Sequence, residues 1–234
     1  MPTDGLSAHY PLDGSAEDLT GINQEGVING AINVANRRNV PNMALGFDGA
    51  TSNVDLGDIL DEIFSGEDKK FSLSFWIKPN ASMSNNLIIS KLGDINCAED
   101  QRAFTIRIFE NKINALFYYS LTSDTFRRWQ GSTVLEPGTW YHIVVNYDGD
   151  IDTDDGANRL AIYINSEFET LLLNGSQGSL GSFQDVTAHL GLGNRLNSNG
   201  ENCATSQVFN GSIDDVRIYN RTLTLNEISI LRRE

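Results

Sequence analysis

The regular succession of short strand-like segments and turn signals, from one end to the other, most constrains the fold of this 234-residue chain. Phe71–Ile77, for example, carries apolar residues at alternate positions, which is typical of a strand with one face in a core. Pairs such as Asp148-Gly149 and Asn210-Gly211 mark turns between segments. No long helical segments alternate with the strands, so the pattern predicts an antiparallel two-sheet sandwich rather than a parallel α/β sheet. The expected strands are Leu6–Leu12, Ala44–Phe47, Asn53–Leu56, Phe71–Ile77, Asn86–Lys91, Ala103–Phe109, Ile113–Tyr119, Trp140–Tyr147, Leu160–Ile164, Glu169–Leu173, Ala188–Leu192 and Val208–Tyr219.

Two segments have helical periodicity. In residues 58–64, Ile59, Leu60 and Ile63 share one face. Residues 225–231 follow Thr224, which with Glu227 has the spacing of a capping box. We find no linker, low-complexity tract or internal repeat, and therefore expect residues 1–234 to form a single domain.

The chain is strongly acidic, with 31 Asp and Glu against 17 Lys and Arg and a formal net charge of -14. Nucleic acids and anionic membranes attract basic surfaces, so this charge argues against both as partners. Acidity also serves as a general solubility device. No run approaches the roughly 18 apolar residues of a membrane-spanning helix, so no membrane insertion is expected. The sequence does not indicate an oligomeric state.

The two cysteines, Cys97 and Cys203, each lie in a polar segment that flanks an expected strand. Buried structural thiols usually lie in apolar segments, whereas a bridge between neighbouring loops has surroundings of this kind. We therefore expect a Cys97–Cys203 disulfide, and with it an oxidising compartment. Two free surface thiols are the alternative.

Two adjacent carboxylates, Asp214 and Asp215, interrupt an apolar strand near the C-terminus. An unpaired buried charge is very costly. One of the two can point to solvent, but the other needs an arginine, a set of N–H donors or a cation.

Several segments, taken together and in order, carry a family resemblance: Ala8–Gly21, Leu45–Gly49, Phe71–Pro79, Gly138–Gly149, Leu160–Asn165 and Gly211–Leu223. They resemble the laminin G-like family of concanavalin A-like jelly rolls, which is common in bacterial extracellular proteins. The resemblance implies an all-β, antiparallel two-sheet jelly-roll sandwich and a secreted or cell-surface location. It says less about function, because this fold hosts lectins, adhesion modules, glycanases and lyases.

The resemblance also implies a calcium (Ca2+) site. The family often holds one calcium ion between an Asp near the N-terminus and an Asp of the last strand, which here match Asp18 and Asp214. Backbone carbonyls of Asn29 or Gly30, and of Ser212, would complete the six to eight oxygens that calcium takes. The alternative pairs Asp214 with an arginine and leaves Asp18 as a turn cap.

A second cation could bind the acidic loop of residues 148–156, which holds Asp148, Asp150, Asp152 and Asp154. Alternating Asp residues are reminiscent of calcium loops, but the closing bidentate Glu of an EF-hand is missing and Arg159 stands near its place. A solvated acidic loop is the commoner meaning of such a run.

A carbohydrate surface is the third candidate, because sugar-binding faces combine a flat aromatic ring with planar hydrogen-bonding side chains. Tyr118 should point away from its two aromatic neighbours, and Trp129 lies between an Arg and a Gln. Aromatic residues in sandwich strands are more often part of the core. The candidate ligand-binding residues are Trp129, Tyr118, Arg127, Arg102, Asn194 and Arg195.

No catalytic residues are expected. The paired carboxylates of glycoside hydrolases have no matching pattern here, and His9, His142 and His189 are each isolated. We therefore expect a non-catalytic, calcium-stabilised binding module that recognises a carbohydrate or cell-surface glycan, or acts in adhesion. The alternatives are a polysaccharide-active hydrolase or lyase, and a structural spacer domain of an adhesin.

Overall fold

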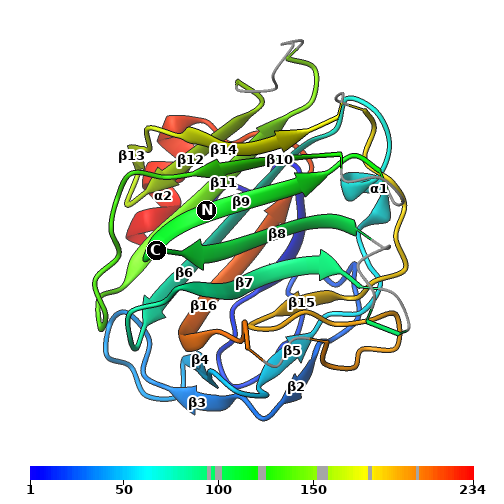
Figure 1. The fold of residues 1–234 in the computed structure, drawn as a ribbon. Helices are drawn as coiled ribbons and strands as arrows, with labels where there is room; N and C mark the ends of the chain where they lie inside the picture. The colour runs from blue at the N-terminus through cyan, green and yellow to red at the C-terminus, as the bar shows by residue number, and fades with distance from the viewer. Residues whose placement is uncertain (94–95, 98–101, 121–124, 152–157, 179–180, 204–205) are drawn as a thin grey trace.

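The computed structural model describes residues 1–93, 96–97, 102–120, 125–151, 158–178, 181–203 and 206–234, and has two antiparallel β-sheets packed face to face (Figure 1). The predicted all-β sandwich is therefore confirmed. Two short helices, α1 (Asp61–Phe64) and α2 (Leu225–Arg233), lie at its margins. The strands are β1 (Leu6–Tyr10), β2 (Val27–Asn29), β3 (Ile32–Val34), β4 (Ala44–Asp48), β5 (Asn53–Asp55), β6 (Lys70–Pro79), β7 (Asn85–Leu92), β8 (Arg102–Phe109), β9 (Lys112–Tyr118), β10 (Phe126–Gln130), β11 (Tyr141–Asp148), β12 (Leu160–Ile164), β13 (Glu167–Phe168), β14 (Leu172–Gln177), β15 (Leu190–Leu192) and β16 (Asn210–Tyr219).

The sheet nearer the viewer in Figure 1, here called the front sheet, has the strand order β14-β10-β9-β8-β7-β15-β5-β2. The back sheet has the order β13-β12-β11-β6-β16-β4-β3, and β1 pairs with β16. Sequence neighbours β8, β9 and β10 are also neighbours in space, so the middle of the front sheet is built from successive hairpins. Within the described ranges, no helix combines the length and apolar character that crossing a bilayer requires.

A single apolar core fills the space between the sheets. Phe71 of β6 contacts Phe64 of α1 with ring centroids 5.2 Å apart, and Phe117 of β9 contacts Tyr147 of β11 at 5.1 Å. Strands of both sheets place apolar side chains inward at alternate positions, which is why apolar residues alternate along the sequence of the predicted strands. The opposite positions of the same strands face outward and are available for other roles.

Both ends of the chain meet on the back sheet. β1 runs antiparallel to β16, with Leu6 opposite Tyr219 and Tyr10 opposite Val216. After β16, the Thr224 side chain accepts a hydrogen bond from the Glu227 N–H, and the predicted capping box begins α2. The first and last segments therefore lie side by side, as the family resemblance implied.

Some predicted boundaries were wrong. The helix expected over residues 58–64 begins only at Asp61, because Leu60 has a left-handed backbone with φ of 64°. Strands β2, β3, β10 and β13 were absent from the prediction, and β14 begins at Leu172 rather than Glu169. The β10 segment lacks apolar alternation in its sequence, since two arginines separate its two aromatic residues.

Candidate functional site

The front sheet carries a hollow of about 260 Å³ on its outer face, directed away from the core. Strand alternation creates it: Phe104, Ile106 and Phe117 face the core, so the residues between them face outward. The hollow is lined by Leu87, Leu92, Arg102, Thr105, Arg107, Leu116, Tyr118, Phe126, Arg128 and Gln207.

Cross-strand pairing fixes how these side chains lie relative to one another. Thr105 of β8 stands opposite Leu116 of β9, and Leu116 stands opposite Arg128 of β10. Tyr118 stands opposite Phe126 in the next outward-facing row, where their rings contact at 6.2 Å. The floor of the hollow is therefore a short ladder of apolar, aromatic and polar side chains held by sheet register.

Two arginines of the hollow donate to neutral oxygens, and the third lies over an aromatic ring. Arg107 donates from Nε to the Asn114 side-chain oxygen at 2.9 Å, and Arg128 donates from Nε to the Asn174 carbonyl at 2.5 Å. The Arg102 guanidinium lies over the Tyr118 ring, 5.3 Å from its centroid. Each cationic group is thus held in place at the edge of the hollow before any ligand arrives.

The Thr105 hydroxyl lies buried beneath the floor of the hollow. The residue is 2% exposed, and its Oγ1 has no hydrogen-bond partner among the described residues. A buried polar group without a partner costs free energy, so such groups are uncommon. Because Oγ1 itself is buried, the hydroxyl is a local cost to the fold and is not a group that the hollow presents to a ligand.

Two of the predicted ligand-binding residues, Tyr118 and Arg102, line this hollow. Trp129 does not: it is 1% exposed and packs in the core against Phe117 at 6.0 Å. Arg127 is also wrong as a ligand contact, because it is buried and donates to the carbonyls of Phe126 and Gly178. Both errors arose because β10 was not predicted from the sequence. The alternation of side chains along this strand turns residues 127 and 129 inward.

The other eight lining residues were not among the predicted ligand contacts, and they include Thr105, Arg107, Leu116 and Arg128. The first three lie in correctly predicted strands, at positions that alternate with core residues. The same alternation that placed Tyr118 outward could have found Leu116, Thr105 and Arg107 on that face. Arg128 could be assigned to this face only once the position of β10 was known.

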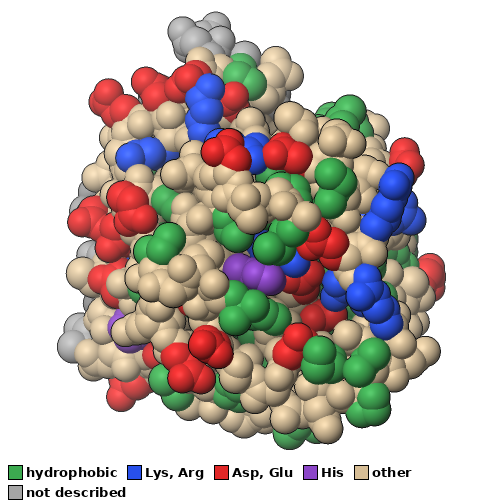
Figure 2. All heavy atoms as spheres, turned by 180° about the vertical axis from the view of Figure 1, so that it is seen from behind, with side chains coloured by type: hydrophobic (Ala, Val, Ile, Leu, Met, Phe, Trp, Pro, Cys, Tyr) green, Lys and Arg blue, Asp and Glu red, His purple; other side chains and the backbone are tan. Residues whose placement is uncertain are grey.

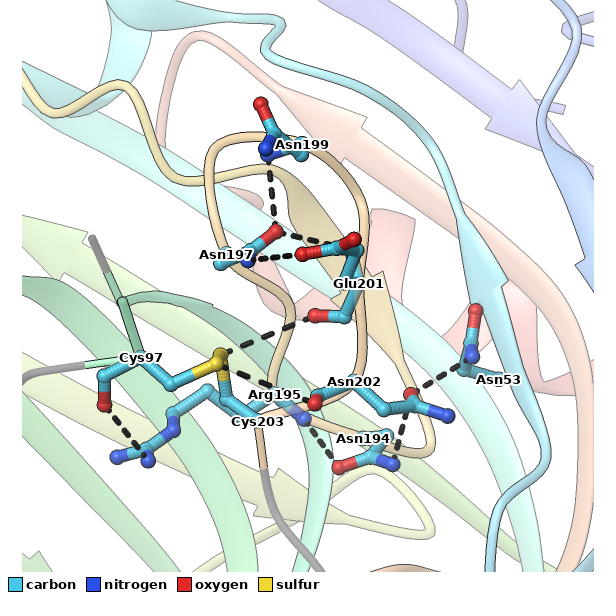
Figure 3. Close-up of a disulfide and its surroundings, with 9 residues drawn as sticks. All are labelled: Asn53, Cys97, Asn194, Arg195, Asn197, Asn199, Glu201, Asn202 and Cys203. Carbon is cyan, nitrogen blue, oxygen red and sulfur yellow. Dashed lines mark hydrogen bonds between the residues drawn. A yellow bond between two sulfur atoms is a disulfide. The ribbon is translucent and has the colours of Figure 1, made fainter. Parts of the chain in front are cut away.

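The predicted disulfide between Cys97 and Cys203 is present, with Cα atoms 5.1 Å apart (Figure 3). It closes a loop of 106 residues between the segments that follow β7 and precede β16. In the chain-entropy description, a bridge over a loop of this length contributes roughly 4–5 kcal/mol.

Asn194 and Arg195, two further predicted ligand contacts, belong to the structure around this bridge. Asn194 is fully buried and donates to the Asn202 side-chain oxygen at 2.8 Å, while Arg195 donates to the Cys97 carbonyl at 3.3 Å (Figure 3). Asn53 donates to the same Asn202 oxygen. The hydrogen bonds of Asn194 therefore serve the loop, so its assignment as a ligand contact was wrong, and neither residue lines the hollow.

The outer face of the back sheet has a compact group of ion pairs, which we call the terminal ion cluster (His9, Arg37, Asp214, Asp215 and Arg217). Arg37 lies 2.6 Å from an Asp214 oxygen and 3.3 Å from an Asp215 oxygen. The other Asp215 oxygen lies 2.9 Å from His9 and 3.1 Å from Arg217. Acidic and basic side chains both reach this face, where a histidine is visible between hydrophobic and acidic groups (Figure 2).

A β-bulge explains why both carboxylates join the cluster. The register of β16 against β6 shifts between Asp214 and Arg217, and Asp215 has a left-handed φ of 54°. The expectation that one carboxylate of the pair could point to solvent was therefore wrong, since both are buried. Burial raises the pKa of Asp214 to about 7 despite Arg37. Burial acts in the same direction on Asp215, but its contacts with His9 and Arg217 outweigh it and lower the pKa.

Asp18 lies in a different environment. Its carboxylate accepts hydrogen bonds from the His9 N–H at 2.8 Å, from Thr20 and from Asn23. Burial alone would raise the pKa of Asp18, yet these donors together hold it below the usual value. Asp18 therefore acts as the cap of the turn that follows β1.

The described residues do not fit a cation shared by Asp18 and Asp214, because N–H donors surround the first and Arg37 occupies the second. Gly30 and Ser212 line another hollow together, and neither carboxylate lines it. Asn29 donates to the Asn53 side chain. No group of three or more His, Cys, Asp or Glu side chains arranged for a metal occurs within the described ranges.

Half of the predicted second cation site lies outside the described residues, namely Asp152 and Asp154. Of the other two, Asp148 lies 3.2 Å and Asp150 lies 2.6 Å from Lys70 Nζ. These two carboxylates therefore have a cationic side chain between them.

Comparison with known proteins places this arrangement in a family. The profile described as the concanavalin A-like lectin/glucanases superfamily matches residues 48–229. No curated protein matches the chain. Among solved structures, domain 4 of an extracellular GH43 arabinanase from Geobacillus stearothermophilus, in complex with arabinotriose, is 18% identical with a TM-score of 0.63, covering 99% of this chain and 100% of that one.

Two clostridial toxin structures are similar as well. The binding domain of Paraclostridial Mosquitocidal Protein 1 is 16% identical (TM-score 0.66), covering 97% of this chain and 52% of that one. The ligand-binding domain of botulinum neurotoxin serotype D, in complex with N-acetylneuraminic acid, is 14% identical (TM-score 0.60), covering 98% and 51%. The chain thus spans about half the length of these toxin structures. Since the profile covers most of its residues, the chain belongs to the concanavalin A-like lectin/glucanase superfamily, as a laminin G-type jelly roll.

Proposed function

We propose that this chain is a non-catalytic glycan-binding module and that the hollow on the front sheet is its sugar site. The observation that carries the proposal is the meeting, on one outward face, of two aromatic rings and three arginines. Sugars offer hydroxyls for polar side chains and C–H faces for aromatic ones, so this lining suits them. The arabinotriose and N-acetylneuraminic acid bound by two similar structures support the class of ligand.

The binding test compares three proteins on a glycan array and then by titration calorimetry. Wild type should bind one or more glycans, and Tyr118→Ala should weaken binding about tenfold or more by removing one wall of the hollow. Phe168→Ala is the matched control, because Phe168 is an exposed aromatic residue of the back sheet and 63% exposed. Melting curves of each variant correct for loss of folded protein. Equal binding by wild type and Tyr118→Ala would show that the sugar site is not this hollow. If none of the three proteins bound any glycan, a structural spacer would be the remaining function.

A polysaccharide-active hydrolase or lyase is the second candidate, because arginines and a tyrosine converge in the hollow. The described lining residues include no Asp, Glu or His, whereas glycoside hydrolysis commonly uses two carboxylates. Incubation with any glycan that binds, followed by chromatography of the products, separates the two functions. Shortened chains that Tyr118→Ala does not produce would make the module an enzyme.

The calcium ion inferred from the family resemblance stays a prediction. If it binds, calcium should raise the melting temperature, chelator should lower it, and Asp214→Ala should abolish the gain. The Arg37–Asp214 contact at 2.6 Å means that such an ion would have to displace a guanidinium. A melting curve that is identical in calcium and in chelator would remove the metal from the proposal.

We also propose that the module is secreted or displayed at a cell surface, and that adhesion is its biological setting. The Cys97–Cys203 bridge supports this, because disulfides persist mainly in oxidising compartments. Mass spectrometry of the alkylated, non-reduced protein purified from its host should find no free thiol. Alkylation of both cysteines would argue for a reducing compartment.

A further inference from the structure

The loop between β3 and β4 brings one arginine, Arg37, to the outer face of the back sheet. Its guanidinium donates to an Asp214 oxygen at 2.6 Å and to an Asp215 oxygen at 3.3 Å. The same group lies over the Trp76 ring of β6, 4.8 Å from the ring centroid. One cation thus contacts both carboxylates of the bulged last strand and an aromatic ring, and its side chain is only 12% exposed. Such a contact differs from an ordinary surface ion pair, which is solvated and contributes little.

The loop holds this arginine in position through its own hydrogen bonds. The Asn36 side-chain oxygen accepts from the N–H groups of Arg38 at 2.9 Å and Val40 at 3.1 Å. The Asn36 N–H donates to the Val40 carbonyl at 3.1 Å, and Asn39 takes a left-handed φ of 59° that closes the turn. Arg37 therefore extends from a backbone that is already ordered, so less entropy is lost when its guanidinium reaches the carboxylates.

Protein groups already connect the two carboxylates that the family resemblance assigns to a shared calcium ion. The His9 N–H donates to Asp18 at 2.8 Å, and His9 Nε2 lies 2.9 Å from Asp215. Arg37 then joins Asp215 to Asp214. Calcium takes six to eight oxygen ligands, whereas here N–H donors surround Asp18 and a guanidinium contacts Asp214. The positive charge beside Asp214 therefore comes from the chain itself.

We propose that the Arg37 guanidinium takes the place that the family resemblance assigns to calcium, as a tethered cation in the cluster that joins the first and last strands. The inference goes beyond the glycan-binding function and does not rest on it. A cation attached to the backbone cannot be removed by a chelator or by dilution, so the stability of the module should not depend on calcium. The calcium prediction and this inference exclude each other at Asp214, and the following measurements decide between them.

The first measurement compares the melting temperature of wild type in excess calcium and in chelator. The two values should agree within about 1 °C, because no ion has to bind for the cluster to form. Asp214→Ala is measured under the same two conditions to locate any effect. A calcium-induced rise that Asp214→Ala abolishes would overturn the inference. A rise that Asp214→Ala retains would come from another site and would leave Arg37 as the cation beside Asp214.

The second measurement removes the tethered cation and supplies a free one. Arg37→Ala should melt roughly 10 °C below wild type, since two buried carboxylates lose their shared partner. Methylguanidinium at about 10 mM should recover several degrees, because a hollow of about 260 Å³ beside both carboxylates admits it. Sodium chloride of the same ionic strength should recover none. Arg38→Ala, at the exposed neighbouring position, is the control: it should melt like wild type and gain nothing from methylguanidinium.

Arg37→Met separates the charge from the packing, because its side chain can still cover the Trp76 ring. This variant should nevertheless melt well below wild type, because the carboxylates stay without a cation. A melting temperature equal to that of wild type would overturn the inference, since the cluster would then need no cation. An Arg37→Ala variant that folds but gains nothing from methylguanidinium would overturn it as well. If Arg37→Ala does not fold, the comparison of wild type with Asp214→Ala still decides the question.

Discussion

The outer faces of the two sheets use arginine in opposite ways. On the back sheet, Arg37 and Arg217 lie within ion-pair distance of Asp214 and Asp215, and the cluster joins the first and last strands. On the front sheet, Arg107 and Arg128 are held by neutral oxygens at the rim of a hollow. The same side chain thus closes the fold on one face and shapes a binding surface on the other.

This difference between the two faces indicates where a binding site can be sought in a β-sandwich of this kind. Charges that neutralise one another inside a bulged strand contribute to folding, even when they come from the most distinctive sequence motif. Aromatic and cationic side chains that line an outward-facing hollow are, by contrast, candidates for contact with a ligand. The predictions below test whether the two faces really divide in this way.

The largest effect is expected on the back sheet. Arg37→Ala should lower the free energy of unfolding by about 3–5 kcal/mol, because it leaves two buried carboxylates without their shared guanidinium. Urea denaturation at a pH one unit above the Asp214 pKa of about 7 measures the loss with that carboxyl ionised. Arg38→Ala, at the exposed neighbouring position, should change stability by no more than about 0.5 kcal/mol. A similarly small loss for both variants would show that the cluster does not close the fold.

Acid should destabilise the protein through His142, which lies on β11 beside Ser74 and Trp76. Burial lowers the pKa of His142 from 6.5 to about 3, so below pH 6.5 the unfolded chain binds a proton that the folded protein does not. Stability from this group is complete above pH 6.5 and is lost as pH falls toward 3, by up to about 1.4 kcal/mol per pH unit. His142→Gln should flatten the pH dependence of unfolding by that slope. An unchanged slope would mean that His142 titrates normally in the folded state.

The smallest expected change in stability is on the front sheet. Thr105→Val removes the partnerless hydroxyl and keeps the side-chain shape, so the free energy of unfolding should stay the same or rise by up to about 1 kcal/mol. Glycan affinity should change by less than about twofold, because the buried Oγ1 does not reach the hollow. A clear loss of stability would show that the hydroxyl has a partner in the folded protein.

The fold was predictable because period-two alternation and turn residues recur through the whole chain. Phe71–Ile77 shows that pattern clearly, whereas Phe126–Gln130 does not. Because this strand was not predicted, Trp129 and Arg127 were expected on the ligand-facing surface, although both are buried. The disulfide was predictable because both cysteines lie in polar loops beside strands.

The site was only partly predictable. Alternation turned Tyr118 outward, as in the structure, whereas Arg102 was chosen because it lies near Cys97 in the sequence. The convergence of β8, β9 and β10 side chains depends on sheet register, which is set by long-range pairing. The pairing of Arg37 with Asp214 spans 177 residues, and no local pattern distinguishes that guanidinium from a cation. A bulge at Asp215 then turned both carboxylates to one side.

The most direct test of the division between the faces is an NMR titration of the isotope-labelled protein with a glycan selected on the array. We predict chemical-shift changes at the backbone amides of Thr105, Leu116 and Arg128, on three adjacent strands of the front sheet. The amides of His9 and Asp215 should stay unchanged. Shifts centred on the terminal ion cluster, with the front sheet unaffected, would contradict the account.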